Sequence, residues 1–138
     1  MLGHLLALWQ SLYRGLALTA AELPDKPHSE GHQRQLQQML TCIQSSYGEP
    51  LTLADIAGAA FISKSSAMHI FQQGLGITPV AYLIEYRLQQ AAGMLRGTSR
   101  SVTEIAGRTG FQSAGYFCRQ FKKMFGCTPL DYRKGRQG

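Results

Sequence analysis

The chain has 138 residues, 44% of them hydrophobic and 16% charged, and a formal net charge of +6. This length suffices for one domain, or for two small helical units that share a core. Eleven basic and four acidic residues follow residue 50, a balance of +7, whereas the first fifty residues carry three basic and four acidic residues. Basic clustering of this kind favours a polyanionic partner, most often nucleic acid, although such a surface can also serve only solubility.

Residue usage argues against several classes of protein. The three cysteines form no CxxC pair, so we expect neither a zinc finger nor a disulfide framework, in keeping with a reducing cytoplasm. Of the four scattered histidines, His28 and His32 are four residues apart, but both lie in or beside an expected linker. The chain has no Gly-rich phosphate loop, GxSxG motif or catalytic-triad pattern. We therefore expect no metal, no other cofactor and no enzymatic activity. The first twenty residues lack a basic start and contain polar interruptions, which argues against a signal peptide and a membrane span.

Proline and glycine stand at the apparent helix boundaries and runs of β-branched residues are few, so we expect an all-α fold. Residues 2–18 have the i, i+3, i+4, i+7 apolar pattern of an amphipathic helix. Such a helix needs a partner surface: the following helices, a second copy of the chain, or a larger upstream region. A linker is expected over 24–31, so that 1–31 stand apart from 32–138. The next helix, 32–46, has the apolar stripe Leu36, Met39, Leu40 and Ile43.

Residues 32–78 contain a helix-turn-helix pattern. Thr52-Leu-Ala-Asp55 has the form of a capping box and starts a short helix. After a turn, Ser63 is a suitable N-cap for a recognition helix over about 63–74, and Gly76 is suited to end it. The helical period divides this helix into two faces. Its expected buried face is Ala67, Ile70, Phe71 and Leu75, and its expected outward face is Ser65, Met68, His69 and Gln72.

A long linker helix is expected over 79–96, starting with Thr78 as N-cap and Pro79 in the first turn. Its eighteen positions would span about 27 Å at roughly 1.5 Å per residue. Residues 97–138 then repeat the earlier plan, with an offset of 49 residues before the turn and 50 after it. So many matches in the same order indicate two copies of one helix-turn-helix unit. Ser101-Val-Thr-Glu104 matches the first capping box, and the second recognition helix is expected over about 113–125.

The second recognition helix has one aromatic face and one basic face. Phe117, Phe121 and Phe125 are four residues apart and therefore share a side of the helix. The opposite side carries Gly115, Cys118, Arg119 and Lys122. Gly126 is suited to end the helix, and Thr128-Pro129 to start another.

These outward residue types suit contacts with DNA. Arg119 is the strongest candidate for a base contact, because a guanidinium can donate to guanine O6 and N7 in the major groove, and Lys122 lies one turn later. In the first unit, Ser65, His69 and Gln72 can hydrogen-bond to bases, Met68 offers an apolar contact, and Lys64 suits a phosphate.

Other residues are candidates for the DNA backbone. Thr52 and Ser101 begin helices whose N–H groups could meet phosphates, although both can be ordinary caps. Lys123, Arg133 and Lys134 are expected near phosphates or as solvated charge. Residues 101–138 carry +5 against +2 for residues 51–100, so we expect the second unit to dominate attraction to phosphate.

Between about Gln35 and Arg133, the sequence resembles the DNA-binding domain of the AraC/XylS family of bacterial transcription regulators. The first unit matches through Ile56-Ala57, Ser63, Phe71, Gly76, Pro79, Tyr82 and the Arg87-Leu88 helix. The more specific match is in the second unit, at Ile105-Ala106, Gly110-Phe111, Ser113, Tyr116-Phe117, Arg119, Phe121-Lys122, Phe125-Gly126, Pro129 and Tyr132-Arg133.

The resemblance implies a seven-helix domain whose two recognition helices enter adjacent major grooves of double-stranded DNA, and it implies contacts with RNA polymerase, which members often make. The implied base-facing positions are Lys64, Ser65, Met68, His69, Gln72, Ala114, Gly115, Cys118, Arg119 and Lys122. The sequence departs from the family pattern at His69, where many members carry arginine, and at Ser66-Ala67.

Most members of the family also carry an effector-binding or dimerisation domain, for which fifty residues are too few. We therefore expect either a stand-alone regulator or the C-terminal part of a longer one, with dimerisation through residues 2–18 or through the further domain. The alternative function is a helical protein-interaction module or adaptor without specific DNA binding, and a third reading is a nonspecific nucleoid-type binder. A DNA binder should lose affinity steeply with salt, whereas an interaction module should not.

Overall fold

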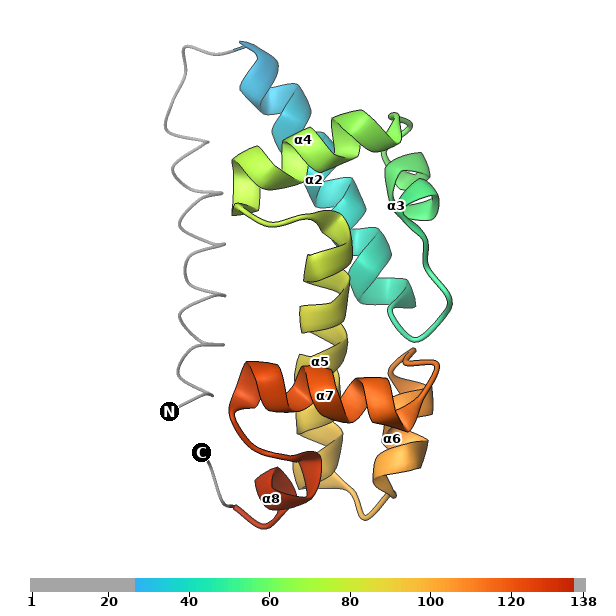
Figure 1. Cartoon of the computed structure of the whole chain (residues 1–138). Coiled ribbons are helices and arrows are strands. Elements are labelled where there is room, and N and C mark those ends of the chain that lie inside the picture. Colours follow the sequence, from blue (N-terminus) through green and yellow to red (C-terminus); the bar gives the residue numbers. More distant parts are fainter. Residues whose placement is uncertain (1–26, 136–138) are drawn as a thin grey trace. The chain divides into compact units, whose positions relative to one another are not determined.

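The computed structural model describes residues 27–135, and within that range all regular structure is helical (Figure 1). This confirms the all-α prediction; the helix predicted over 2–18 lies outside the described residues. No helix in residues 27–135 has both the length and the apolarity to span a membrane. The helices are α2 (Pro27–Ser46), α3 (Leu53–Ala59), α4 (Lys64–Leu75), α5 (Pro79–Gly97), α6 (Val102–Arg108), α7 (Ala114–Phe125) and α8 (Pro129–Arg133).

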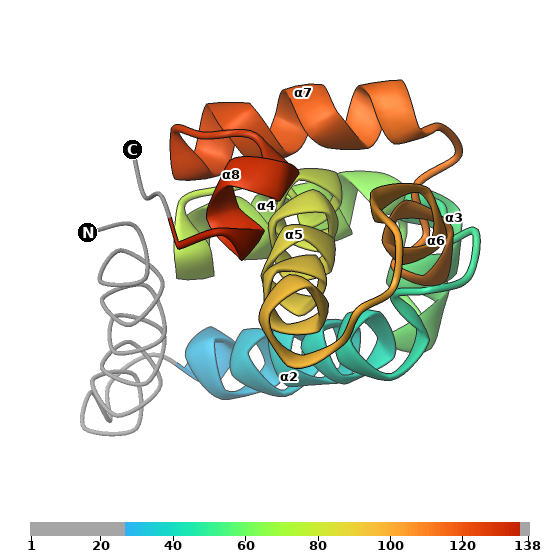
Figure 2. The same ribbon diagram turned by 90° about the horizontal axis from the view of Figure 1, so that it is seen from below.

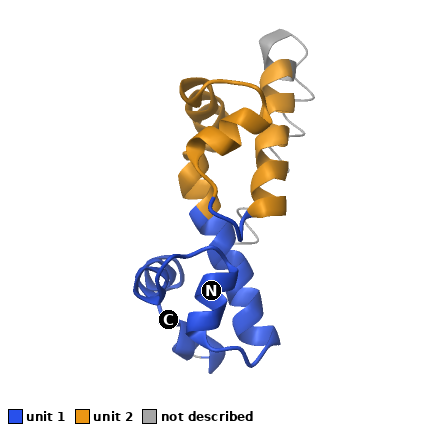
Figure 3. Cartoon of the chain, turned by 90° about the vertical axis from the view of Figure 1, so that its right-hand side faces the viewer, with its two compact units in different colours: residues 1–6, 47–50, 84–138 blue, residues 7–46, 51–83 orange. Residues whose placement is uncertain are grey.

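The chain divides into two compact units (Figure 3). The N-terminal unit, orange in the figure, contains α2, α3, α4 and the first turn of α5, within residues 7–46 and 51–83. The C-terminal unit, blue in the figure, contains the rest of α5 with α6, α7 and α8, together with the segment 47–50. The helix predicted as a separate linker thus contributes residues to both cores.

The core of the N-terminal unit forms where α4 crosses α2 (Figure 1). Phe71 of α4 is fully buried, and its ring meets that of Tyr82 at a centroid distance of 5.7 Å. The helices approach closely at Gly74, where a Cβ would lie 2.6 Å from Leu36 Cδ2 of α2 and the leucine side chain would have to shift. The buried side chains include Met39, Leu40, Ile43, Ile56, Ala57, Ala67, Ile70 and Leu83.

The core of the C-terminal unit is built on three phenylalanines of α7, which lies across α5 (Figure 2). Phe117, Phe121 and Phe125 are each 0% exposed, as their spacing predicted. The rings of Phe121 and Phe125 stack at 4.4 Å, and the Tyr132 ring of α8 meets both. Burial of one such side chain contributes roughly 1.5–3 kcal/mol, so this face fixes how α7 is rotated about its axis.

Most helix ends form as the local sequence predicted. Ser63 caps α4 by accepting a hydrogen bond from the Ser66 amide, while Gly76 and Gly126 end α4 and α7 in the left-handed conformation. Thr52 and Asp55 form both hydrogen bonds of the predicted capping box.

The second predicted capping box is only half formed, which corrects the expectation. Ser101 accepts from the Glu104 amide, but the Glu104 carboxylate accepts instead from Arg108 Nε at 2.9 Å and forms an ion pair with Arg100, whose Nε lies 3.1 Å away. These two arginines lie one turn on either side of Glu104, and charge-assisted hydrogen bonds are stronger than a bond from a neutral amide.

The boundary of the first described helix also differs from the prediction. The sequence suggested a linker over 24–31, yet α2 already begins at Pro27. Proline suits the first turn of a helix, where its missing N–H has no partner to lose. Gly31, which suggested a break, lies within the helix, because one glycine costs only about 1 kcal/mol relative to alanine.

The two helix-turn-helix turns share a backbone feature. Phe61 and Gly110 occupy matching positions at the offset of 49 residues, and both have positive φ, 58° and 91°. In the C-terminal unit only glycine fits, because a Cβ at Gly110 would lie 2.5 Å from the Tyr47 carbonyl oxygen. In the N-terminal unit a bulky residue takes the left-handed conformation, with its side chain 90% exposed.

An arginine caps the C-terminal end of α5. Arg133 Nε donates to the Leu95 carbonyl at 3.0 Å, and its Nη2 donates to the carbonyls of Thr98 and Arg100. The guanidinium therefore satisfies one carbonyl group in the last turn of α5 and two in the segment that follows the helix. The sequence predicted Arg133 beside a phosphate or as solvated charge; in the structure its guanidinium is hydrogen-bonded to the chain's own carbonyl groups.

We predict that Phe61→Gly raises the free energy of unfolding by about 0.5–1 kcal/mol. Left-handed backbone costs a side-chain-bearing residue roughly 1–2 kcal/mol, and the gain is partly offset by the greater freedom of glycine in the unfolded chain. Denaturant unfolding followed by circular dichroism measures the change. Gly110→Ala is the matched control and should lose more than about 1 kcal/mol. Lower stability of Phe61→Gly would show that the exposed ring makes a stabilising contact.

We also predict that Arg133→Lys lowers the free energy of unfolding by about 1–3 kcal/mol, because lysine keeps the charge but loses the planar set of donors. Affinity for random DNA, measured by fluorescence anisotropy, should stay within twofold of the native value. Lys134→Ala, at the exposed neighbouring position, should change stability by less than about 0.5 kcal/mol. Unchanged stability with weaker DNA binding would assign Arg133 to phosphate instead.

Candidate nucleic-acid interface

α4 presents a polar face to solvent in the N-terminal unit. Its apolar residues Ala67, Ile70 and Phe71 are buried, and this orientation directs the opposite side outward. Of the predicted base-facing residues, Met68 is partly buried and the others, Lys64, Ser65, His69 and Gln72, are exposed.

α7 presents the corresponding face in the C-terminal unit. Gly115, Arg119 and Lys122 are exposed, whereas Ala114 and Cys118 are half-buried and pack against the core. Gly115, Arg119 and Lys122 thus share the exposed side of α7, away from the three buried phenylalanines, whereas Ala114 and Cys118 lie toward the core.

Neither recognition helix contains a carboxylate. The sequence of α4 is KSSAMHIFQQGL and that of α7 is AGYFCRQFKKMF, so every ionisable side chain on both except the Tyr116 hydroxyl and the Cys118 thiol is a base. A helix that approaches phosphates without an acid on it meets no like-charge repulsion from its own side chains. This property distinguishes α4 and α7 from the short helices α3 and α6, which carry Asp55 and Glu104 in their first turns.

The predicted backbone contacts are less uniform. The Thr52 and Ser101 hydroxyls accept hydrogen bonds within their caps, and two hydrogen bonds with Thr52 hold the pKa of the Asp55 carboxyl below its ordinary value. Lys123 and Lys134 are exposed and available to phosphate, whereas the Arg133 guanidinium is bound to carbonyl groups at the end of α5.

Two residues that the sequence reasoning did not assign to a role stand out. Arg87 donates from Nε to the Tyr47 carbonyl at 2.7 Å and from Nη2 to the Glu49 carbonyl at 2.8 Å, which anchors the segment 47–50. Burial lowers the pKa of the Arg87 guanidinium, and Tyr116 acts in the opposite direction. Tyr116 is an exposed aromatic residue on α7, and its i, i+3 spacing from Arg119 was the signal that could have found it.

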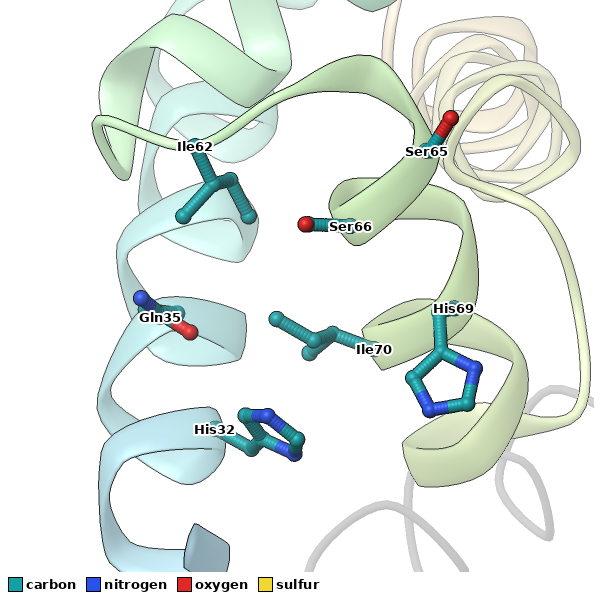
Figure 4. Close-up of a pocket in the computed structure, with 7 residues that line it drawn as sticks. All are labelled: His32, Gln35, Ile62, Ser65, Ser66, His69 and Ile70. Atoms are coloured by element: carbon teal, nitrogen blue, oxygen red, sulfur yellow. The ribbon is translucent and has the colours of Figure 1, made fainter.

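A hollow of about 400 Å³ lies between α2 and α4 in the N-terminal unit (Figure 4). His32 of α2 and His69 of α4 lie at its edge, with ring centroids 6.4 Å apart in an edge-to-face arrangement. Among the described residues, no group of three or more His, Cys, Asp or Glu side chains could hold a metal ion. The remaining lining residues are Gln35, Ile62, Ser65, Ser66 and Ile70.

Comparison with known proteins identifies the family. A family model described as a helix-turn-helix domain matches residues 56–135, which include both turns and both recognition helices. An uncharacterized HTH-type transcriptional regulator of Bacillus subtilis, YdeC, is 37% identical over 99 residues, which are 72% of this chain and 34% of that protein. The HTH-type transcriptional activator RhaR of Mannheimia succiniciproducens is 38% identical over 98 residues, 71% of this chain and 36% of RhaR. The chain spans about a third of the length of these relatives.

Two solved structures match the fold over most of their length. A transcriptional regulator of Chromobacterium violaceum, described as AraC-type, has a TM-score of 0.72 and 32% identity, covering 78% of this chain and 96% of that one. The DNA-binding domain of AdpA, solved in complex with a target DNA, has a TM-score of 0.70 and 28% identity, covering 72% and 90%. The two helix-turn-helix units, the matched family model and these relatives agree. The chain belongs to the AraC family of helix-turn-helix transcription regulators.

Proposed function

We propose that the chain binds a specific site in double-stranded DNA by placing the outward faces of α4 and α7 in the major groove, and so regulates transcription. The observation that carries this proposal is the pair of recognition helices, each anchored by a buried apolar face and each free of carboxylates on its polar face. The AdpA domain, which is similar in fold, was solved with its target DNA, and this supports the same partner here.

In this proposal α7 supplies the stronger sequence discrimination. Arg119 donates to guanine O6 and N7, and Lys122 contacts the next base or a phosphate one turn along. Gly115 and Ala114 allow close approach, and the half-buried Cys118 contacts a thymine methyl group.

α4 supplies a second set of contacts of different chemistry. Ser65, His69 and Gln72 hydrogen-bond to base edges, Met68 offers an apolar contact, and Lys64 pairs with a phosphate. α5 has 19 residues, about 28 Å at roughly 1.5 Å per residue. We expect the two recognition helices to contact segments about one turn of DNA apart, roughly 34 Å.

The proposed role is that of a binding protein and not of an enzyme, and the three free cysteines suit a reducing cytoplasm. Contacts with RNA polymerase, and a dimer formed through residues 2–18 or through a further domain, remain predictions. The alternative function, a protein-interaction module, is motivated by the apolar pattern of residues 2–18. Selection of bound DNA sequences distinguishes it from a sequence-specific DNA binder.

Selection of bound sequences from a random DNA pool, followed by footprinting, tests the proposal. We expect one enriched site with two protected segments on one face of the duplex. Protection of a single segment would leave α4 as a clamp on the backbone. Absence of enrichment at every salt concentration would favour the interaction module, and binding without sequence preference would favour a nucleoid-type binder.

For the selected site, we predict that Arg119→Ala weakens binding by about 1–3 kcal/mol, with little change on random DNA, because it removes a base contact. Arg119→Lys is the matched control: it keeps the charge but loses the bidentate geometry, so it should lose most of the same discrimination. Competition binding on both DNAs measures the two effects. Equal losses on both would assign Arg119 to a phosphate.

We further predict that Lys123→Ala combined with Lys134→Ala weakens binding to all sequences alike and reduces the slope of log affinity against log salt by about 2. Each phosphate neutralised on duplex DNA contributes roughly 0.9 to that slope through counterion release. Salt titrations of the double variant and of the native chain give the difference. An unchanged slope would mean that both lysines are solvated charge.

A further inference from the structure

The guanidinium of Arg119 lies back along α7 toward its N-terminal end. A Cβ built at Gly115 would be 3.5 Å from Arg119 Nη1, so the guanidinium passes beside a position without a side chain. Helical side chains point toward the N-terminus, which places an arginine over the residue four positions earlier. The Arg119 guanidinium therefore lies directly alongside Gly115.

The Arg119 guanidinium also lies near an aromatic ring, that of Tyr116. The Arg119 guanidinium carbon is 6.0 Å from the centroid of the Tyr116 ring, within the range of a cation–π contact. The Tyr116 ring in turn packs against Phe111, with centroids 6.1 Å apart and planes tilted by 51°. Phe111 belongs to the core of the C-terminal unit and is 6% exposed, so Tyr116 is anchored from beneath while it remains 38% exposed.

Arg119 has no polar partner among the described residues. The ion pairs there join Glu104 to Arg100 and Arg108, and no hydrogen bond from the Arg119 guanidinium to the described part of the chain is found. All five N–H donors of the guanidinium thus face solvent or a ligand. The groups that lie beside this guanidinium include the Tyr116 ring and the backbone of Gly115.

We propose that Tyr116 is a positioning residue that sets sequence specificity: its ring holds the Arg119 guanidinium over Gly115 in the orientation that donates to a guanine edge. This inference rests on the proposed function. Binding to DNA lowers the conformational entropy of a mobile arginine side chain, and this cost weakens affinity. A ring that already holds the side chain in place before binding should therefore raise affinity by roughly 3- to 10-fold. The ring acts through its π face, so the hydroxyl is dispensable for this role.

The test is a double-mutant cycle with the full chain. The native chain, Tyr116→Leu, Arg119→Ala and the double variant are measured on the selected site and on the same site with the Arg119-dependent base pair replaced. We expect Tyr116→Leu to weaken binding to the selected site by about 3- to 10-fold. It should have no effect on the replaced site or in the Arg119→Ala background. Tyr116→Phe keeps the ring and should bind within twofold of the native chain.

Several results would overturn the inference while leaving the proposed function intact. One is that Tyr116→Leu lowers affinity equally in every background, and another is that Tyr116→Phe lowers affinity as much as Tyr116→Leu does. A third is that Tyr116→Leu leaves affinity for the selected site unchanged although Arg119→Ala abolishes the preference for that site. A native chain that does not prefer the selected site would overturn the proposed function and the inference together.

A second measurement separates positioning from folding. The side-chain Nε–H resonance of Arg119 should show restricted motion in the native chain and in Tyr116→Phe, and free motion in Tyr116→Leu, all without DNA. Circular dichroism first shows whether Tyr116→Leu folds, and Tyr116→Met replaces it if it does not. Equal mobility in the native chain and in the variant without the ring would refute the positioning role.

Discussion

The interaction on which the proposed function depends is the burial of three phenylalanine rings on one side of α7. Phe117, Phe121 and Phe125 occur at the helical period, so their removal from water fixes the rotation of the helix about its axis. Once that rotation is fixed, Arg119 and Lys122 must face outward. The side proposed to face DNA is therefore a consequence of the core, and α4 obeys the same constraint through Ala67, Ile70 and Phe71.

Arginines of equal charge take different roles according to the acceptors near them. Arg133 meets the free carbonyl groups at the end of α5, and Arg87 meets those of the segment 47–50. Arg119 meets an aromatic ring and no acceptor among the described residues, so its donors remain available. The balance of +7 after residue 50 indicated a polyanionic partner, but charge alone could not say which arginines the fold itself uses.

Features that depend on neighbouring residues could be predicted from the sequence, and features that depend on distant ones could not. The caps at Ser63 and Gly76 follow from local chemistry, as do the buried faces of the two recognition helices. The capping box predicted at Glu104 is an exception among local features, because Arg100 and Arg108 lie one turn away on either side and compete for its carboxylate. The Arg133 cap joins residues 33 to 38 positions apart in the sequence, and no helical period reveals such a pair.

The two turns show how one duplicated unit acquired different constraints. At Gly110 the Tyr47 carbonyl and the Arg87 side chain approach so closely that any Cβ would collide, and glycine also suits the positive φ. Phe61 has the same positive φ, but its side chain points into solvent, so no neighbouring group prevents a side chain at this position. Both turns have matching backbone hydrogen bonds, but only at Gly110 do the Tyr47 carbonyl and the Arg87 side chain exclude a side chain. A helix that must place one guanidinium against one base edge benefits from the more constrained turn, and this agrees with the stronger discrimination proposed for α7.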